Sequence, residues 1–407
     1  MKNLINIFLR HTEHRQLYRR ILFTMMIMII YIIGSNIEIL STANIDSKKD
    51  VFTTIGVAAM GGDYSRVSLF SLGLGPYLTS MLIINLLAFR NSDAVFMQTK
   101  KERQIKEKLL ILALSIVQGY HLLSMYVKNG EDKAEIMALG LLVVIAGSML
   151  LIWLADQNFM YGIAGPMPIV VMSIIKSIAY GDHTVVIHLK IFIWFIIILL
   201  LLLCAILLII IERAEYRINY IDILNVSKIQ KNFLAWKLNP GGSLAIMLSM
   251  SIFIIIKSII EMFIVMFTKH KLESIKYMDL THPLGITFFV LLLGILAYLL
   301  SLLMLNPKKK AQEFRKTGNY IVGVNPGKET SQFLSKKAKR ISLFSAFMIS
   351  VIIGLPFYFT LLVPELSKEI YLSIQILMLI YVSINIMDVI RNYMYFNRYK
   401  SYMNKYW

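Results

Sequence analysis

The feature that most constrains the fold of this chain is the apolar run at residues 191–211. It contains 21 residues and no charged side chain. Because an α-helix rises about 1.5 Å per residue, a helix of this length crosses the hydrocarbon core of a bilayer, which is about 30 Å thick. The whole chain has the same character, with 57% hydrophobic residues, 16% charged residues and a mean hydropathy of +0.66. These values exclude an ordinary soluble domain and predict a membrane protein.

Similar apolar runs recur along the 407 residues and predict an all-α polytopic membrane protein with ten transmembrane helices. The spans must be helical because a backbone inside lipid has to satisfy its own hydrogen bonds. The expected spans are 19–40, 67–89, 107–127, 134–155, 163–180, 187–211, 242–267, 284–305, 341–362 and 369–390. Ten spans divide into two groups of five, as in folds built from two pseudo-symmetric halves. We therefore expect halves at residues 1–180 and 181–407, on the number of spans alone, since no internal repeat is visible.

The net charge of +18 is explained mainly by membrane topology. With ten spans, both termini lie on the same side of the membrane. When charges at the margins of spans are assigned to the adjoining segment, the segments on that side carry 30 lysines and arginines. The opposite segments carry 9, and Lys176, Lys190 and Lys257 fall within spans. Because basic residues concentrate on the cytoplasmic side, this bias predicts cytoplasmic termini, and no nucleic-acid partner is needed.

The segment VFTTIGVAAMGGDYS, residues 51–65, lies between the first two spans. Its apolar part is too short to cross a bilayer, and it ends at the flexible pair Gly61–Gly62. One interpretation is an ordinary external loop. The other is a re-entrant piece of helix on a hinge, which is tolerated at membrane depth only where it lines a cavity inside the protein.

Sequence patterns of known catalytic chemistry are missing. The chain has no HExxH, GxSxG or P-loop motif, and Cys204 is its only cysteine. We therefore expect a protein that is not an enzyme and that uses no cofactor and no metal. Lys257 and Glu261 lie deep in a span, one helical turn apart, where a structural ion pair is the simpler interpretation. A coupling site there would favour an alternative function, that of a ten-span secondary transporter of small solutes.

Two long basic segments interrupt the apolar runs, at residues 212–242 and 306–340. Their tyrosines, isoleucines and aromatic residues are too apolar for disordered linkers. In the second segment, Gly318, Gly323 and the pair Pro326–Gly327 punctuate a short apolar run, which predicts turns and a hairpin. Segments of this kind suit the docking of a large, electrostatically steered cytoplasmic partner, while the simpler interpretation is a charge run that only anchors the topology.

Five stretches carry a more specific signal. They are LFSLGLGPYLTSMLIINLL (69–87), YGIAGP (161–166), ERAEYRINY followed by KLNPGG (212–242), the segment 306–344 that begins NPKKKAQEFRKTGNYIVGVNPGKETSQFL, and IMDVIRNYMYFNRYKSY (386–402). In this order and spacing they resemble the SecY family of protein-translocation channels, over nearly the whole chain. The segment 306–344 is the most specific, with its Asn-Pro start, Lys-Thr-Gly middle, Pro-Gly turn and Thr-x-x-Phe-Leu exit.

The resemblance implies an hourglass channel with a plug at about residues 53–65 and a side gate between spans 2/3 and 7/8. The plug residues it implies are Ile55, Val57, Met60, Gly61 and Gly62. The positions that match the apolar pore constriction of the family are Leu74, Leu78, Met167, Val171 and Met247, of which the last three are weaker matches. A collar of flexible apolar side chains excludes water and ions at rest and parts around a passing polypeptide without binding it.

The resemblance also implies that the two basic segments dock a SecA-type motor ATPase. The docking residues it implies are Arg217, Lys308, Lys309, Lys310, Arg315, Lys316, Asn325, Pro326, Gly327 and Lys328. Further implied partners are small SecE-like or SecG-like subunits or accessory Sec subunits, membrane lipids, and an unfolded polypeptide as the substrate.

Three departures from the family pattern point to its accessory branch in Gram-positive bacteria. Asn325 stands where an arginine usually precedes Pro-Gly, Tyr216 replaces the first of two arginines, and the glycine-rich start of span 5 has become GIAGP. Accessory members work with their own SecA-type motor and export serine-rich, glycosylated surface proteins. The alternative within the family is the housekeeping channel of general secretion.

Overall fold

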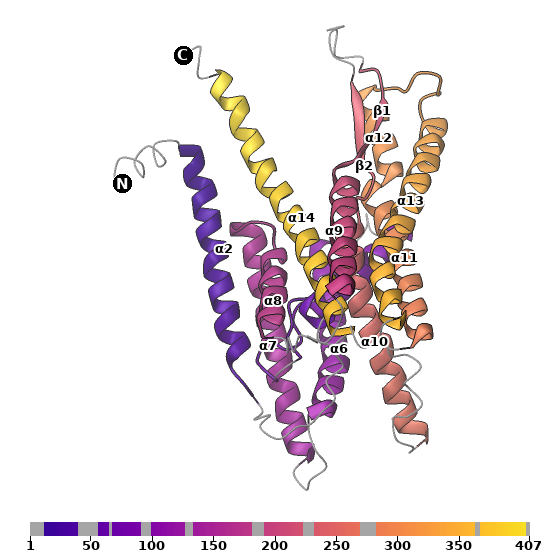
Figure 1. The fold of residues 1–407 in the computed structure, drawn as a ribbon. Helices are drawn as coiled ribbons and strands as arrows, with labels where there is room; N and C mark the ends of the chain where they lie inside the picture. Colours follow the sequence, from indigo (N-terminus) through magenta and orange to yellow (C-terminus); the bar gives the residue numbers. More distant parts are fainter. Residues whose placement is uncertain are drawn as a thin grey trace.

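The structure is a computed structural model that describes residues 12–39, 56–64, 67–90, 99–126, 133–180, 191–222, 232–268, 282–362 and 367–403. Helices dominate these residues, and one two-stranded antiparallel sheet joins them (Figure 1). The helices are α2 (Thr12–Asn36), α4 (Gly75–Arg90), α6 (Lys100–Tyr126), α7 (Lys133–Tyr161), α8 (Met167–Tyr180), α9 (Ile191–Arg213), α10 (Gly242–Thr268), α11 (Pro283–Leu305), α12 (Pro307–Thr317), α13 (Lys328–Leu362) and α14 (Ser367–Met403). The strands are β1 (Glu215–Asn219) and β2 (Phe233–Lys237).

Each of the ten expected spans falls on a helix of the described part of the chain, with α12 as an additional helix outside the spans. Six of the described helices are long and apolar enough to cross a membrane, and two shorter ones, at Gly75–Phe89 and Met167–Tyr180, are also apolar. The uncharged run at residues 191–211 lies in α9 without interruption. The start of α2 and the end of α14 lie at the same end of the molecule as β1, β2 and α12 (Figure 1).

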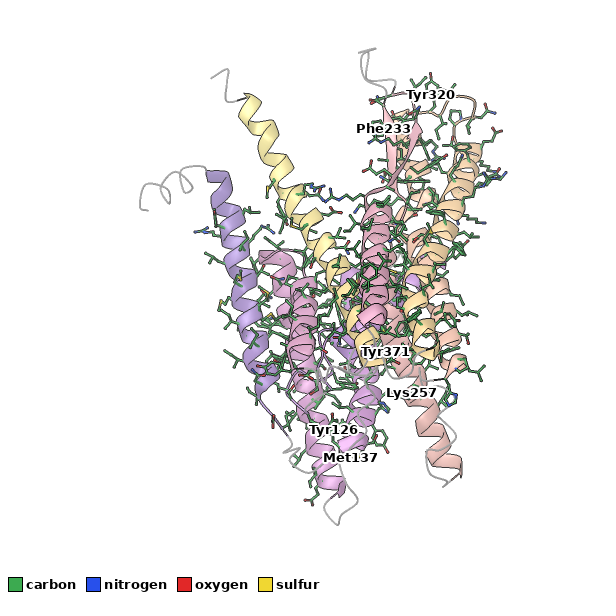
Figure 2. All side chains as sticks on the ribbon, in the orientation of Figure 1. Tyr126, Met137, Phe233, Lys257, Tyr320 and Tyr371 are labelled. Atoms are coloured by element: carbon green, nitrogen blue, oxygen red, sulfur yellow. The ribbon has the colours of Figure 1, made fainter. Side chains whose placement is uncertain are left out.

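Helix α10 is central to the packing. It contacts α4 and α6 from the first part of the chain and α11, α13 and α14 from the second. Helix α8 packs against α2 and α14, and α7 packs against α2 and α6. Side chains fill the space between these helices (Figure 2) and form one continuous apolar core that reaches from Ile27 in α2 to Val382 in α14. The contacts of α10 with α4 and α6 lie where the resemblance expects a side gate.

Two expected spans begin later than predicted. The helix of span 2 begins at Gly75 and not at residue 67, because residues 69–74 form turns and Gly73 has a positive φ of 61°. The helix of span 5 begins at Met167 and not at residue 163. Here Ala164 and Gly165 have φ values of 59° and 55°, a left-handed conformation that a right-handed helix cannot include.

The prediction of a hairpin within residues 318–330 is wrong. The turns are present, since Gly318, Gly323 and Gly327 all have positive φ, but no strand forms in this stretch. The hairpin lies in the other basic segment, where β1 and β2 pair in antiparallel register with Ile218 opposite Leu234. A single bridge between Ile221 and Tyr320 joins the two segments.

Candidate functional site

Residues 56–62 form a short segment that is buried among the helices. Residues 56–58 make one turn of helix, a turn follows, and every residue from 56 to 62 is buried. Val57, Ala58, Ala59 and Met60 are each at most 2% exposed. The sequence left an external loop and a re-entrant piece of helix open for this segment, and its buried position is the one that a re-entrant segment requires. Ile55 and the flanking residues 53–54 and 65 lie outside the described residues.

The apolar face of this segment packs against α4, α8 and α10. A β-carbon placed on Gly56 would lie 3.1 Å from Cδ1 of Ile254, and Met250 also lies beside this glycine. The backbone N–H of Leu74 donates a hydrogen bond to the carbonyl of Met60 at 2.8 Å. A β-carbon on Gly61 would lie 3.3 Å from Ile169 and 3.6 Å from Leu74. The segment therefore occupies a site that three helices share.

Two glycines allow the chain to fold back on itself here. Gly73 has φ +61°, and a β-carbon on it would lie 2.3 Å from the amide nitrogen of Gly62. A β-carbon on Gly62 would lie 2.4 Å from the carbonyl oxygen of Ser71. Because both clashes are with backbone atoms, side-chain rotation cannot relieve them. A hydrogen bond of 3.0 Å from the Asp63 N–H to the Ser71 carbonyl holds the two parts of the chain together here.

The five residues predicted to form a constriction fall on the elements around this segment. Leu74, Leu78 and Met247 are buried, at most 3% exposed, and Met167 and Val171 are partly buried and pack against the same core. Among the five, Leu74 contacts residues 56–62, because its backbone N–H bonds to Met60 and its side chain lies beside Gly61.

Three apolar residues that contact the segment were not predicted from the sequence: Ile169, Met250 and Ile254. A signal for two of them was available. Met250 and Ile254 follow Met247 at positions i+3 and i+7, so they lie on the same face of α10. Ile169 lies two positions from Met167 and two from Val171, which were both predicted to line the constriction.

At the end of the molecule where α2 begins and α14 ends, the two basic segments pack into one body (Figure 1). We call residues 215–222, 232–238 and 305–341 the loop module. Its buried core is Ile218, Trp236, Leu305, Ala311, Phe314, Ile321, Leu334, Ala338 and Ile341, which come from β1, β2, α12, the turns after it and the ends of α11 and α13. Ile221 and Tyr320 exchange backbone hydrogen bonds of 2.9 and 3.1 Å across the two segments. The labelled Phe233 and Tyr320 mark this module in Figure 2.

Most of the residues predicted to dock a partner lie on the surface of the loop module. Lys308, Lys309, Arg315, Lys316, Arg217 and Lys328 are exposed, as are Asn325 and Pro326, whereas Gly327 is partly exposed. Lys310 forms an ion pair with Glu313 at 2.7 Å, and its hydrogen bond to that carboxylate lowers the pKa of Glu313. Arg217 lies over the ring of Phe233, with 4.5 Å between Cζ and the ring centroid. The fold therefore gathers cations that are about 90 residues apart in the sequence.

Two of the three positions that depart from the family pattern, Asn325 and Tyr216, make contacts within the loop module. The N–H of Asn325 donates to the carboxylate of Glu329 at 3.4 Å, and its carbonyl accepts from the hydroxyl of Thr330 at 2.9 Å, which secures the start of α13. The hydroxyl of Tyr216 accepts a hydrogen bond from Lys337 at 2.9 Å. Tyr216 thus joins the β-hairpin to α13.

A polar network, which the sequence analysis did not predict, joins the loop module to the helices. Lys237 in β2 contacts Asp388 at 2.5 Å and Glu212 at 3.5 Å. Asn239 donates to Glu212 and to the hydroxyl of Tyr381, and its side-chain oxygen accepts from Ser345 at 2.7 Å. Burial alone would lower the pKa of Lys237, but the hydrogen bond to Asp388 and the charge of Glu212 raise it above its ordinary value.

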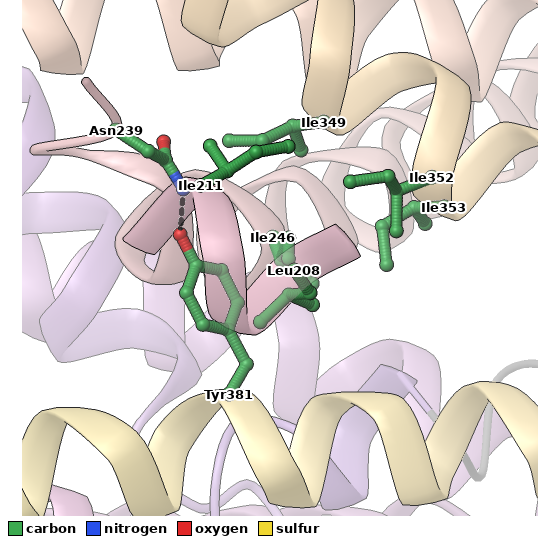
Figure 3. Close-up of a pocket in the computed structure, with 8 residues that line it drawn as sticks. All are labelled: Leu208, Ile211, Asn239, Ile246, Ile349, Ile352, Ile353 and Tyr381. Atoms are coloured by element: carbon green, nitrogen blue, oxygen red, sulfur yellow. Dashed lines mark hydrogen bonds between the residues drawn. The ribbon is translucent and has the colours of Figure 1, made fainter. Parts of the chain in front are cut away.

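The network borders a small pocket between α9, α10, α13 and α14. Figure 3 shows Asn239 and Tyr381 bonded at one side of it, with apolar side chains around them. The remaining lining residues are Leu208, Ile211, Ile246, Ile349, Ile352 and Ile353. Among the described residues, no group of three or more His, Cys, Asp or Glu side chains lies close enough together to hold a metal ion.

Comparison with known families decides the fold. The model of the SecY family matches residues 68–387. The chain belongs to the SecY family. A full-length SecY relative is the accessory Sec system protein translocase subunit SecY2 of Staphylococcus haemolyticus. It is 46% identical over 396 residues, which cover 97% of this chain and 99% of the relative.

Two solved structures share the SecY fold at low identity. A protein-conducting channel aligns with a TM-score of 0.68 at 14% identity, over 93% of each chain. A SecY structure, described as one whose plug domain stabilises the closed state of the translocation channel, aligns with a TM-score of 0.64 at 14% identity, over 93% of this chain and 92% of that one. Together with the six apolar helices, family membership makes this chain a multi-pass protein of the cytoplasmic membrane.

Proposed function

We propose that this chain is the central protein-conducting subunit of an accessory Sec translocase. The observation that carries the proposal is the full-length match, at 46% identity, to an accessory SecY2 translocase subunit. The proposed substrates are serine-rich, glycosylated surface proteins that cross the membrane unfolded, and the energy comes from a SecA-type ATPase. The chain itself then needs no catalytic site and no cofactor, because a channel only provides a path.

In this proposal, the segment 56–62 is the plug of a closed channel, and Leu74, Leu78, Met167, Val171 and Met247 form the constriction. Ile169, Met250 and Ile254 join the set because they contact the segment. Apolar side chains at a constriction exclude ions at rest, and methionine adapts to different passing side chains. The packing of α10 on α4 and α6 then corresponds to a closed side gate.

Crosslinking tests the constriction. Leu74→Cys and Leu78→Cys, each introduced with Cys204→Ala, should crosslink to a stalled translocating polypeptide that carries a single cysteine. Leu199→Cys is a matched control, because Leu199 is exposed on the surface of α9. It should react with lipid-soluble reagents and not with the polypeptide. Crosslinks at Leu199 and none at the two leucines would contradict the placement.

We further propose that the loop module docks the motor ATPase in the cytoplasm, with both chain termini on that side. Its exposed cations would steer an acidic surface, and its own apolar core would hold them in a fixed arrangement. Replacing Lys308, Lys309, Lys310, Arg315 and Lys316 with glutamate should abolish co-purification of the motor at physiological salt and leave membrane insertion intact. Unchanged binding would refute the assignment.

Two finer points belong to the same proposal. The halves at residues 1–180 and 181–407 would part at the side gate, and small SecE-like, SecG-like or accessory subunits would assist the channel. Cysteines placed near each terminus, in the Cys204→Ala background, test the orientation. They should react with a membrane-impermeant maleimide in inside-out vesicles and not in intact cells.

A further inference from the structure

Lys176 is the one charged residue of α8, and polar groups surround its ammonium group. It lies in α8 with a side chain that is 15% exposed. A charged residue at such a position is costly unless it is paired, and within membrane spans it usually has a functional partner. The Nζ of Lys176 lies 3.1 Å from Oδ2 of Asp63, and it also donates to the carbonyl and hydroxyl of Ser35 at 2.9 and 3.1 Å. These three acceptors match the three donors of an ammonium group.

Asp63 directly follows the buried segment 56–62. Its side chain is 16% exposed, so this ion pair is mostly withdrawn from water. The two preceding residues are held by the same helices. The hydroxyl of Tyr31 in α2 donates to the carbonyl of Gly61 at 3.0 Å, and the hydroxyl of Ser173 in α8 donates to the carbonyl of Gly62 at 2.7 Å. Polar groups on α2 and α8 thus hold three consecutive residues.

The segment also has contacts with α10 and with the residues just before α4. Gly56 packs on Met250 and Ile254 of α10, and Met60 bonds to Leu74 at the start of α4. If α10 moves away from α4, the apolar cover over Gly56 is lost, but the polar contacts from α2 and α8 remain. These polar contacts, together with the packing of Gly61 on Ile169 of α8, then hold the segment after the helices separate. Gly61, which has a left-handed φ of +80°, is the first of the three residues that these polar groups hold.

We propose that the ion pair between Lys176 and Asp63 is a latch that sets how readily residues 56–62 leave their buried position. Lys176 is a positioning residue in this scheme, since it acts through Asp63. The inference deepens the proposed channel function and rests on it, because the release of a buried segment matters only where a path opens behind it. The latch keeps the segment attached to α2 and α8 until a passing polypeptide or a helix movement breaks the pair.

The accessibility of a buried cysteine measures the latch directly. Ala58 is 2% exposed, so Ala58→Cys in the Cys204→Ala background reports release of the segment through its reaction with a water-soluble maleimide. In full-length protein in lipid nanodiscs, Lys176→Met and Asp63→Asn should each raise the labelling rate by about tenfold, which corresponds to 1.4 kcal/mol. Lys176→Arg should stay near the parent rate. Lys106→Met, at an exposed lysine of α6, is the matched control and should not change it.

Charge reversal separates a latch from a general loss of stability. The double variant Asp63→Lys with Lys176→Asp should return the labelling rate toward that of the parent protein, while either reversal alone should raise it. Equal labelling of parent, Lys176→Met and Asp63→Asn overturns the latch, as does a double reversal that labels as fast as the singles. Neither result depends on transport. Failure of the channel proposal would appear separately, as reconstituted protein that passes neither ions nor polypeptide even when the latch variants label rapidly.

Discussion

The buried segment 56–62 and the loop module are held in opposite ways. The segment has no core of its own, and it is buried by side chains of α2, α4, α8 and α10 and fixed through its backbone carbonyls. The loop module surrounds its own apolar core, with Leu334 and Ala338 fully buried, and presents its charges outward. A segment held only by its neighbours can leave when they move, whereas a body with its own core keeps its shape. The first arrangement suits a part that moves and the second suits a docking platform.

The largest effect is expected from removing the core of the loop module. Phe314 is 7% exposed and contacts the ring of Tyr220, so Phe314→Ala should cost about 3–5 kcal/mol of local stability. Limited proteolysis should then cut residues 306–340 rapidly, while labelling of Ala58→Cys stays unchanged. Phe347→Ala is the control, since Phe347 is 64% exposed on α13 and its loss should cost less than about 1 kcal/mol. Faster labelling at Ala58 in Phe314→Ala would show that the two regions are coupled and would break the comparison.

The next prediction compares two glycines of like conformation, one that packs against the buried segment and one in the loop module. Gly73 and Gly323 have φ of +61° and +80°, so alanine at either should cost about 1–2 kcal/mol in backbone strain. At Gly73 the new β-carbon also meets the backbone of Gly62, which should add about 1–3 kcal/mol, while at Gly323 nothing lies within 4 Å. Gly73→Ala should therefore lower the thermal unfolding midpoint more than Gly323→Ala and speed labelling at Ala58. Equal shifts would contradict the close approach of residues 62 and 73.

A smaller loss of stability is expected from a substitution at Asn239, where the loop module joins the helices. Asn239→Ala removes a donor to Glu212, which is 4% exposed, and an acceptor for Ser345, and should cost about 1–3 kcal/mol. Calorimetry of the purified protein should show this loss, whereas Asn219→Ala, at an exposed residue of β1, should change stability by less than about 0.5 kcal/mol. If Asn239→Ala is neutral, the network does not join the module to α13 and α14.

The smallest effect belongs to the surface pair of Lys310 and Glu313. The pKa of Glu313 is lowered in the folded state, so the pair stabilises the module above the ordinary glutamate pKa. That contribution is lost as the pH falls through the lowered pKa. Glu313→Gln should thus shift the unfolding midpoint slightly at pH 7, and the difference from the parent should vanish in acid. Lys310→Met should give the same shift, and the double variant should add nothing to it; additive shifts would show that the two residues act independently.

The sequence predicted the helices well and the packing between them poorly. Each of the ten expected spans falls on a described helix, because an apolar run inside lipid must satisfy its own backbone hydrogen bonds and does so as a helix. The fold of residues 67–74 was not predicted, because it depends on the contact between Gly62 and Gly73, which are 11 residues apart. The roles of Tyr31, Ser173 and Lys176 were invisible for the same reason.

The loop module shows a signal that was present and overlooked. Tyr216, Ile218 and Tyr220 alternate with polar residues, which is the period of a strand, and Ala311 and Phe314 are spaced as on one face of a helix. The density of lysines and arginines concealed both patterns. The two segments that carry the predicted docking residues nevertheless fold on a common core, so these residues belong to one body.

The most direct test of the whole account is reconstitution of the purified chain in proteoliposomes with each of two motors, the accessory and the housekeeping SecA-type ATPase. The measured quantity is the fraction of a serine-rich polypeptide that becomes protected from external protease in the presence of ATP. The account predicts protection with the accessory motor and little with the housekeeping motor. Protection with the housekeeping motor alone would contradict the accessory assignment, and no protection with either would contradict the channel itself.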